Sequence, residues 1–165
     1  MVLDLAAGGG RHSRLLCDTG FAVRAVDHDV SALLPLAGTR CEVHQIDLET
    51  GAAWPLGEGY DGIVVTNYLH RPLLPAIGRA LAPVGVLIYE TFALGSERFG
   101  RPQNPDFLLR RSELLDAFAK LTVIAFEQGE ITTPRSAVIQ RIAAIAGPLC
   151  RPPEAAGLDS RRSDE

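Results

Sequence analysis

Apolar and polar residues follow one another along the chain in two periods, one typical of strands and one typical of helices. Short, mostly apolar runs that predict buried strands occupy residues 1–5, 21–26, 41–46, 62–66 and 86–91. Segments with helical spacing lie between them, at residues 11–19, 31–37 and 73–81. Buried strands that alternate with amphipathic helices are typical of a mostly parallel sheet with helices on both faces. The pattern therefore predicts a doubly wound α/β fold.

The last third of the chain has a different pattern. Residues 92–111 have no clear period and predict a long loop, which inside a compact domain is more often functional than filler. A helix is expected over residues 112–120, with Ser112 as its N-cap. Two β-rich runs follow at residues 121–128 and 136–146. The seven residues between them are too few for a parallel crossover, so this pair is predicted to be antiparallel.

Length, composition and charge narrow the class of protein. The 165 residues are 47% hydrophobic, which suits one domain, expected at residues 1–147, followed by a disordered tail at 148–165. A net charge of −4, without a basic cluster, argues against a nucleic-acid partner. No apolar run is long enough for a membrane helix, so no membrane partner is expected. A homodimer is left open.

The three cysteines, at positions 17, 41 and 150, form no CxxC pair. They argue against both a disulfide framework and a thiolate metal site. A reducing, cytoplasmic location and no metal are therefore expected.

A glycine-rich turn between the first strand and the first helix is the main candidate for a binding site. It runs through Gly8, Gly9 and Gly10, where backbone N–H groups and a helix N-terminus can face a ligand. Asp27 ends the second strand, where its carboxylate can accept both hydroxyls of a ribose. Any adenosine cofactor fits these features, including NAD, because the turn also approximates the dinucleotide pattern GxGxxG.

Three features favour S-adenosylmethionine over NAD. Asp4 is an acid at a buried strand end and needs a fixed donor such as a loop N–H or a ligand ammonium. Asp47 and Leu48 follow the third strand, where an acid can accept from the adenine amino group while the leucine packs on the ring. The terminal antiparallel hairpin departs from a simple nicotinamide-binding domain.

The segments VLDLAAGGGRHSRLL, VRAVDHD, QIDLE, YDGIVVTNYLHRPLL and VGVLIYETF resemble the successive motifs of class I S-adenosylmethionine-dependent methyltransferases. The likeness spans about residues 2–145, and within the superfamily it is nearest to small bacterial proteins of the tellurite-resistance type. It implies a seven-stranded sheet of order 3-2-1-4-5-7-6 with strand 7 antiparallel. The cofactor contacts that it implies are Asp4, Ala6, Gly8, Gly10, Asp27, His28, Asp47, Leu48, Asn67 and Leu69.

The chain departs from the family pattern in two places. Ala6 stands where the motif usually has glycine, so its methyl group can press the loop away from the methionine end of the cofactor. Class I enzymes also usually carry helices before the first strand, whereas this strand begins at Met1. We expect these N-terminal helices to be missing, through truncation or a wrong start, or their lid to come from another segment or subunit. Weak cofactor binding is the expected consequence.

Acceptor and catalytic residues are expected beyond the C-terminal ends of the strands. His70 is the best candidate for a base, and Tyr68 could orient the acceptor, although each also fits an ordinary structural role. Methyl transfer needs alignment above all, so few catalytic groups are required. The expected substrate contacts are Tyr89, Glu90, Arg101 and Asn104, with pairing to Arg101 as the alternative role of Glu90. The predicted function is methyl transfer to a small molecule; the alternatives are a nicotinamide-dependent oxidoreductase and a non-catalytic domain that keeps the fold.

Overall fold

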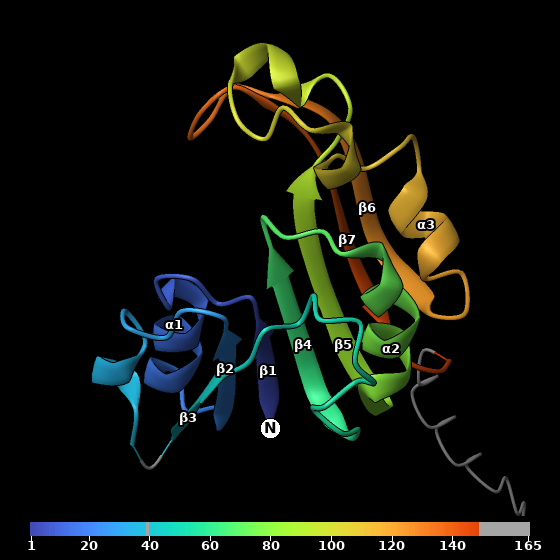
Figure 1. Cartoon of the computed structure of the whole chain (residues 1–165). Coiled ribbons are helices and arrows are strands. Elements are labelled where there is room, and N and C mark those ends of the chain that lie inside the picture. The colour runs from blue at the N-terminus through green and yellow to red at the C-terminus, as the bar shows by residue number, and fades with distance from the viewer. Residues whose placement is uncertain (39, 149–165) are drawn as a thin grey trace, which may run out of the picture.

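One seven-stranded sheet organises the molecule, as the computed structural model shows for the residues it describes, 1–38 and 40–148 (Figure 1). The strand order is β3-β2-β1-β4-β5-β7-β6. β7 pairs antiparallel with β5 and β6, and the other neighbouring strands are parallel. The predicted order and the antiparallel strand 7 are confirmed.

The strands are β1 (Val2–Leu5), β2 (Val23–Asp27), β3 (Cys41–Gln45), β4 (Tyr60–Thr66), β5 (Leu81–Phe92), β6 (Thr122–Ile131) and β7 (Ala137–Ile145). The α-helices are α1 (Arg11–Asp18), α2 (Leu74–Ala80) and α3 (Glu113–Ala117). Short 3-10 turns are η1 (Leu34–Leu36), η2 (Arg71–Leu73), η3 (Ser96–Phe99) and η4 (Pro105–Phe107).

The helices are divided between the two faces of the sheet. α2 and α3 bury Ile77, Leu114 and Phe118 in the main core, against β-strand residues such as Leu87 and Tyr89. α1 packs on the opposite face, where the partly buried Leu16 and Cys17 meet a smaller cluster that includes Val23, Ala25 and Cys41. Both faces of the sheet are therefore used, as the alternating pattern predicted.

The α1 face is only partly covered. Beyond β1, the side chains on this face come from alternate positions of β4, β5 and β7, and they include Val86 paired with Ile145 and Ile88 paired with Ala143. Val86 and Ile88 remain 38% and 43% exposed, whereas Leu87, on the other face of the same strand, is fully buried. Among the described residues, no helix lies over this part of the sheet.

The structure corrects three local predictions. Residues 31–37 form turns and the short η1 rather than an α-helix, because Pro35 cannot donate an N–H inside a helix. β5 begins at Leu81, five residues before the predicted start, and includes the expected turn at residues 82–85. Ser112 precedes α3 with φ 58° but forms no side-chain cap, and its N–H donates to Gln128 Oε1 at 2.7 Å.

Most of the predicted tail, residues 149–165, lies outside the described part of the chain. No helix in the described ranges is long and apolar enough to cross a membrane.

Candidate functional site: an acidic pocket

A pocket of about 510 Å³ opens at the C-terminal ends of β1, β2, β3 and β4. In a parallel sheet this edge collects the loops that follow the strands, and it is where open α/β sheets bind ligands. Six of the ten residues that the sequence predicts as cofactor contacts line this pocket: Ala6, Asp27, His28, Asp47, Leu48 and Asn67. Tyr68, a predicted catalytic residue, also lines it together with Ile46 and Glu49.

The glycine turn bends through backbone conformations that favour glycine. Gly8 and Gly10 have φ of 53° and 72°, and Ala6 has φ of 55°. A left-handed conformation at a residue with a Cβ costs on the order of 1 kcal/mol, which is the price of alanine at this position. Gly10 precedes α1, and a Cβ there would lie 2.7 Å from Leu36 Cδ1 and 2.8 Å from Leu33 Cδ2. The turn is therefore fitted closely against the chain that follows β2.

Asp27 is nearly buried and is held by backbone donors. Gly8 N–H donates to its Oδ2 at 2.8 Å, and Asp29 N–H donates to its Oδ1 at 3.1 Å. The exposed His28 ring places Nδ1 2.9 Å from the same Oδ1. These contacts fix the carboxylate on the pocket wall, and each oxygen can accept more than one hydrogen bond. The group is thus oriented in advance for a ligand with neighbouring hydroxyls.

Asp4 finds its partner within the chain. Its side chain is 1% exposed, and Ser13 Oγ donates to its Oδ2 at 2.5 Å. Burial raises the pKa of Asp4, and the Ser13 hydrogen bond and the nearby His12 oppose the rise. Asp4 does not line the pocket, so its position indicates that it ties β1 to the first turn of α1.

Three carboxylates surround the pocket, from Asp27, Asp47 and Glu49. Its lining includes neither lysine nor arginine. The exposed His28 is the only residue of the lining that can gain a positive charge. The wall therefore favours a cationic ligand and disfavours a polyanion.

The hydroxyl of Tyr68 is buried and has no hydrogen-bond partner among the described residues. Burial, and then the nearby carboxylates of Glu49, Asp47 and Asp27, hold the pKa of Tyr68 well above its usual value. The phenol is therefore a neutral donor at any physiological pH. The Glu49 carboxylate is near enough to act on this hydroxyl but makes no hydrogen bond of ordinary geometry with it, so the atom fits a position where a ligand supplies a better acceptor.

The structure separates several other predicted residues from this pocket. Leu69 is a core residue, 5% exposed. Tyr89 is fully buried, its ring lies tilted against that of Phe118, and its hydroxyl donates to the Tyr68 carbonyl at 2.9 Å, so it contacts the pocket wall from the core side. Glu90 lies 3.4 Å from Arg141, which corrects the suggested pairing with Arg101. His70 is partly buried just before η2 and is not part of the pocket lining, so its catalytic role stays a prediction.

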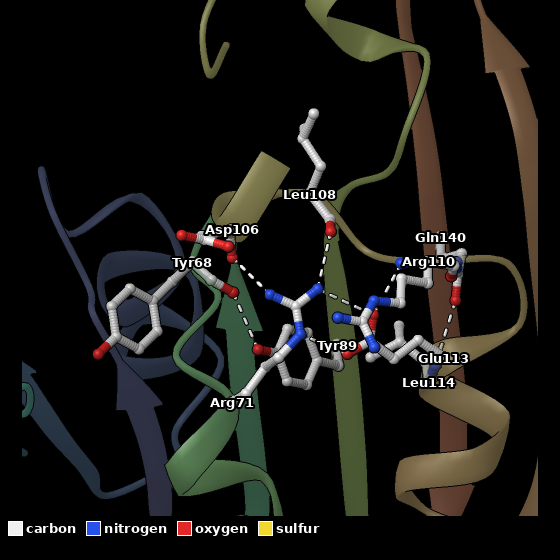
Figure 2. A network of polar contacts seen from close by, with 9 residues as sticks. All are labelled: Tyr68, Arg71, Tyr89, Asp106, Leu108, Arg110, Glu113, Leu114 and Gln140. Atoms are coloured by element: carbon white, nitrogen blue, oxygen red, sulfur yellow. Dashed lines mark hydrogen bonds and ion pairs between the residues drawn. The ribbon is translucent and has the colours of Figure 1, made fainter. Parts of the chain in front are cut away.

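A polar network joins the segment after β4 to the segment after β5 (Figure 2). Arg71 donates to both carboxylate oxygens of Glu113, at 2.7 and 3.0 Å, and to the carbonyls of Asp106 and Leu108, at 2.6 and 2.9 Å. Glu113 also accepts from Arg110 N–H at 2.7 Å. Burial works against the charge on Glu113, but these hydrogen bonds prevail and lower its pKa.

Gln140 on β7 completes the network. Its side chain is fully buried, accepts from Leu114 N–H at 3.1 Å and donates to the Arg110 carbonyl. The long segment between β5 and α3 is thus held at several points by side chains from distant parts of the chain. Figure 1 shows this segment above the C-terminal end of β5.

The other two predicted substrate contacts lie in this segment. Arg101 and Asn104 line a second pocket of about 510 Å³, together with Pro102, Gln103 and Phe107. The structure therefore places six of the predicted cofactor contacts in the first pocket and two of the predicted substrate contacts in the second, while Asp4, Gly8, Gly10, Leu69, Tyr89 and Glu90 line neither.

Sequence reasoning missed two residues of the first pocket and all of the Arg71 network. Ile46 and Glu49 flank the predicted Asp47 and Leu48, and their position directly after β3 was the available signal. Arg71 and Glu113 are 42 positions apart, and no local pattern marks them as partners.

No protein-family model and no curated protein matches the chain. Solved structures do match. TehB from Haemophilus influenzae is 20% identical with a TM-score of 0.70, over 88% of this chain and 57% of its own. The chain thus spans little more than half the length of that protein.

Two further structures show how varied the chemistry of such proteins is. The [4+2]-cyclase SpnF is 12% identical with a TM-score of 0.68, over 87% of this chain and 73% of its own. The 1,6-didemethyltoxoflavin-N1-methyltransferase from Burkholderia thailandensis, solved with S-adenosylhomocysteine, is 21% identical with a TM-score of 0.62, over 88% and 70%. At these identities the likeness establishes the fold. The chain has the fold of class I S-adenosylmethionine-dependent methyltransferases.

Proposed function

We propose that the protein binds S-adenosylmethionine in the acidic pocket and transfers its methyl group to a small molecule. The observation that carries this proposal is the wall of three carboxylates, Asp27, Asp47 and Glu49, without lysine or arginine. The pyrophosphate of NAD would be repelled by such a wall, whereas the sulfonium donor carries a net positive charge. The wall thereby supports the methyl donor over the nicotinamide alternative, which the glycine turn alone left open.

Each part of the donor has a suitable group in the chain. We assign the ribose hydroxyls to Asp27, whose oxygens are already oriented by Gly8 and Asp29. Asp47 and Leu48, on the same pocket wall, would receive the adenine amino group and ring. Gly8 and Gly10 do not line the pocket, and their N–H groups donate to Asp27 Oδ2 and to the Ala7 carbonyl, so we assign the methionine end to the other backbone atoms of this turn.

The donor supplies an electrophilic methyl group, and the protein's task is to align an acceptor with it. Tyr68 supports this role through its buried, unpartnered hydroxyl on the pocket wall. It can hold an acceptor by donating a hydrogen bond, and its raised pKa excludes it as a base. His70 follows two positions later and is proposed as the base for acceptors that arrive protonated. We place the reaction in the cytoplasm.

Calorimetric titration with S-adenosylhomocysteine and with NAD tests the proposal. We expect binding of S-adenosylhomocysteine and none of NAD, and Asp27→Ala should weaken the binding at least about tenfold, because a charge-assisted hydrogen bond contributes roughly 1.5–3 kcal/mol. Asp18→Ala removes a carboxylate at the exposed end of α1 and serves as the matched control. Binding of NAD alone would overturn the proposal in favour of the oxidoreductase, and binding of neither would favour a non-catalytic domain.

A further inference from the structure

The second pocket has the opposite chemistry from the first. Its lining, Arg101, Pro102, Gln103, Asn104 and Phe107, contains a guanidinium, two amides and no carboxylate. Within the described residues, Arg101 makes no hydrogen bond or ion pair, so its guanidinium is available to a ligand. The polar groups of the lining that remain free are therefore mainly donors.

Asn104 illustrates this bias. Its Oδ1 accepts from Asp106 N–H at 3.0 Å and so caps the start of η4. The acceptor atom of the amide is thereby used locally, and its NH₂ group is left to donate. Together with the guanidinium of Arg101, this group favours an anionic ligand, above all a carboxylate, which matches the planar fork of arginine.

The ring of Phe107 adds an apolar surface to the same pocket. Phe107 is 47% exposed, and its ring lines the pocket. The carbonyls on either side of it, from Asp106 and Leu108, both accept hydrogen bonds from Arg71. The ring is thus presented on a fixed backbone, and a flat ligand could stack on it with little ordering cost.

The Arg71 network also links the two pockets. Arg71 follows Tyr68 by three positions, and the carbonyl of Tyr68 is held by the buried hydroxyl of Tyr89. Figure 2 shows Asp106 of η4 on the same side as Tyr68, with Arg71 between these groups and Glu113. Three residues of chain and the hydrogen bonds of Arg71 therefore connect Tyr68, in the wall of the acidic pocket, to the backbone on either side of Phe107.

From these contacts we propose that the second pocket binds the methyl acceptor, and that the acceptor is a small planar molecule with a carboxylate group. The assignment rests on the proposed function. The acidic pocket takes the cationic donor and the second pocket takes the carboxylate of the acceptor, while the reacting end of the acceptor extends to the Tyr68 hydroxyl beside the donor. Phe107 stacks on the flat part, and Arg101 and Asn104 bind the carboxylate.

Nuclear magnetic resonance with benzoate as the probe tests the acceptor site without knowledge of the natural substrate. The ¹⁵N-labelled full chain is titrated with benzoate to about 20 mM, a range suited to a weak ligand of this size, in the presence of S-adenosylhomocysteine. We expect shifts centred on Arg101, Asn104 and Phe107. Benzyl alcohol, which lacks the charge, and acetate, which lacks the ring, should each cause much smaller shifts.

Two variants distinguish specific binding of benzoate in this pocket from a general attraction of benzoate to positively charged residues. Arg101→Ala should weaken benzoate binding at least about tenfold. Arg98→Ala should leave it unchanged, because Arg98 lies in the same segment but is paired with Glu130 at 2.8 Å. Equal binding by the wild type and Arg101→Ala, or shifts confined to the acidic pocket, would overturn the inference.

The same samples report on the proposed function separately. If S-adenosylhomocysteine binds through Asp27 but benzoate does not bind at Arg101, the acceptor assignment falls and the proposed function stands. If S-adenosylhomocysteine does not bind at all, both fall.

Discussion

Tyr60 begins β4 and Tyr68 follows the end of that strand, and their hydroxyls have different surroundings. Tyr60 donates to the Leu56 carbonyl at 2.6 Å and accepts from Arg24 at 2.9 Å. The Tyr68 hydroxyl has neither kind of partner within the described chain. Removal of the two hydroxyls should therefore change the free energy of unfolding by different amounts.

We predict that Tyr60→Phe lowers the free energy of unfolding by about 1–2 kcal/mol, because it breaks two hydrogen bonds and leaves a buried carbonyl unpaired. Tyr68→Phe should leave the ligand-free stability unchanged or raise it, because it removes an unpaired buried donor. Urea denaturation of both variants measures the difference. A loss of stability in Tyr68→Phe as large as that in Tyr60→Phe would show that the Tyr68 hydroxyl is already bonded in the free protein.

Arg71 is the residue on which the segment after β5 depends most. We predict that Arg71→Ala lowers the free energy of unfolding by about 2–3 kcal/mol, an amount reduced for the 29% exposure of its side chain. Arg98→Ala, the control, breaks an ion pair exposed by half or more and should cost less than about 1 kcal/mol. Hydrogen exchange should show loss of protection at residues 106–113 in the first variant alone.

The pH dependence of this effect has a definite sign. The pKa of Glu113 in the folded protein lies below its ordinary value of 4.5, so the ion pair stabilises the fold above about pH 4.5. This contribution is lost as the pH falls through the lowered pKa. The destabilisation caused by Arg71→Ala should accordingly be constant from pH 7 to pH 5 and shrink below pH 4.5. A constant difference down to pH 3 would contradict the assigned role of the ion pair.

Single residues also show where sequence reasoning succeeded and where it stopped. Asp27 and Asp47 could be placed at the pocket because each follows a strand, and parallel strands end at one edge of the sheet. Tyr89 could not be judged, because its position in the strand is the same whether its hydroxyl faces a ligand or, as here, the carbonyl of Tyr68. Such contacts depend on how segments distant in the sequence pack together.

At the scale of elements, the glycine turn and α1 form one unit with the chain after β2. We predict that Gly10→Ala lowers the free energy of unfolding by about 1–2 kcal/mol, since it combines φ 72° with close contacts to Leu33 and Leu36. Gly9→Ala is the control, because its Cβ would meet nothing within 4 Å and its φ is not in the left-handed range. Thermal unfolding should give a lower melting temperature for Gly10→Ala than for Gly9→Ala. Equal melting temperatures would contradict the close fit of the turn.

Element types and order were predictable because buried parallel strands give continuous apolar runs and the hairpin loop is too short for a crossover. The 3-10 turns were not predictable. Residues 31–37 have the apolar spacing of a helix, yet Pro35 and the packing of Leu33 against Gly10 give only η1. At the start of α3, the carboxylate of Glu113 accepts a hydrogen bond from the Arg110 N–H group, whereas the side chain of Ser112 forms no cap.

At the scale of the whole molecule, helices cover one face of the sheet more completely than the other. Substitutions on the two faces of β5 should show this difference in stability. We predict that Leu87→Ala lowers the free energy of unfolding by about 3–4 kcal/mol, because this fully buried side chain would leave a cavity under α2 and α3. Ile88→Ala, one position along, should cost roughly 1 kcal/mol, since its side chain is 43% exposed. Similar losses in urea denaturation would mean that the second face is covered in solution.

The acidic wall of the first pocket has a consequence for turnover. In the proposed reaction, methyl transfer converts a sulfonium into a neutral thioether, so the donor loses one positive charge while Asp27, Asp47 and Glu49 keep their negative charges. The attraction that helps to load the pocket is therefore absent once the product has formed. On that proposal, the charge difference favours the exchange of spent cofactor for fresh cofactor, and added salt would weaken this preference by screening the three carboxylates.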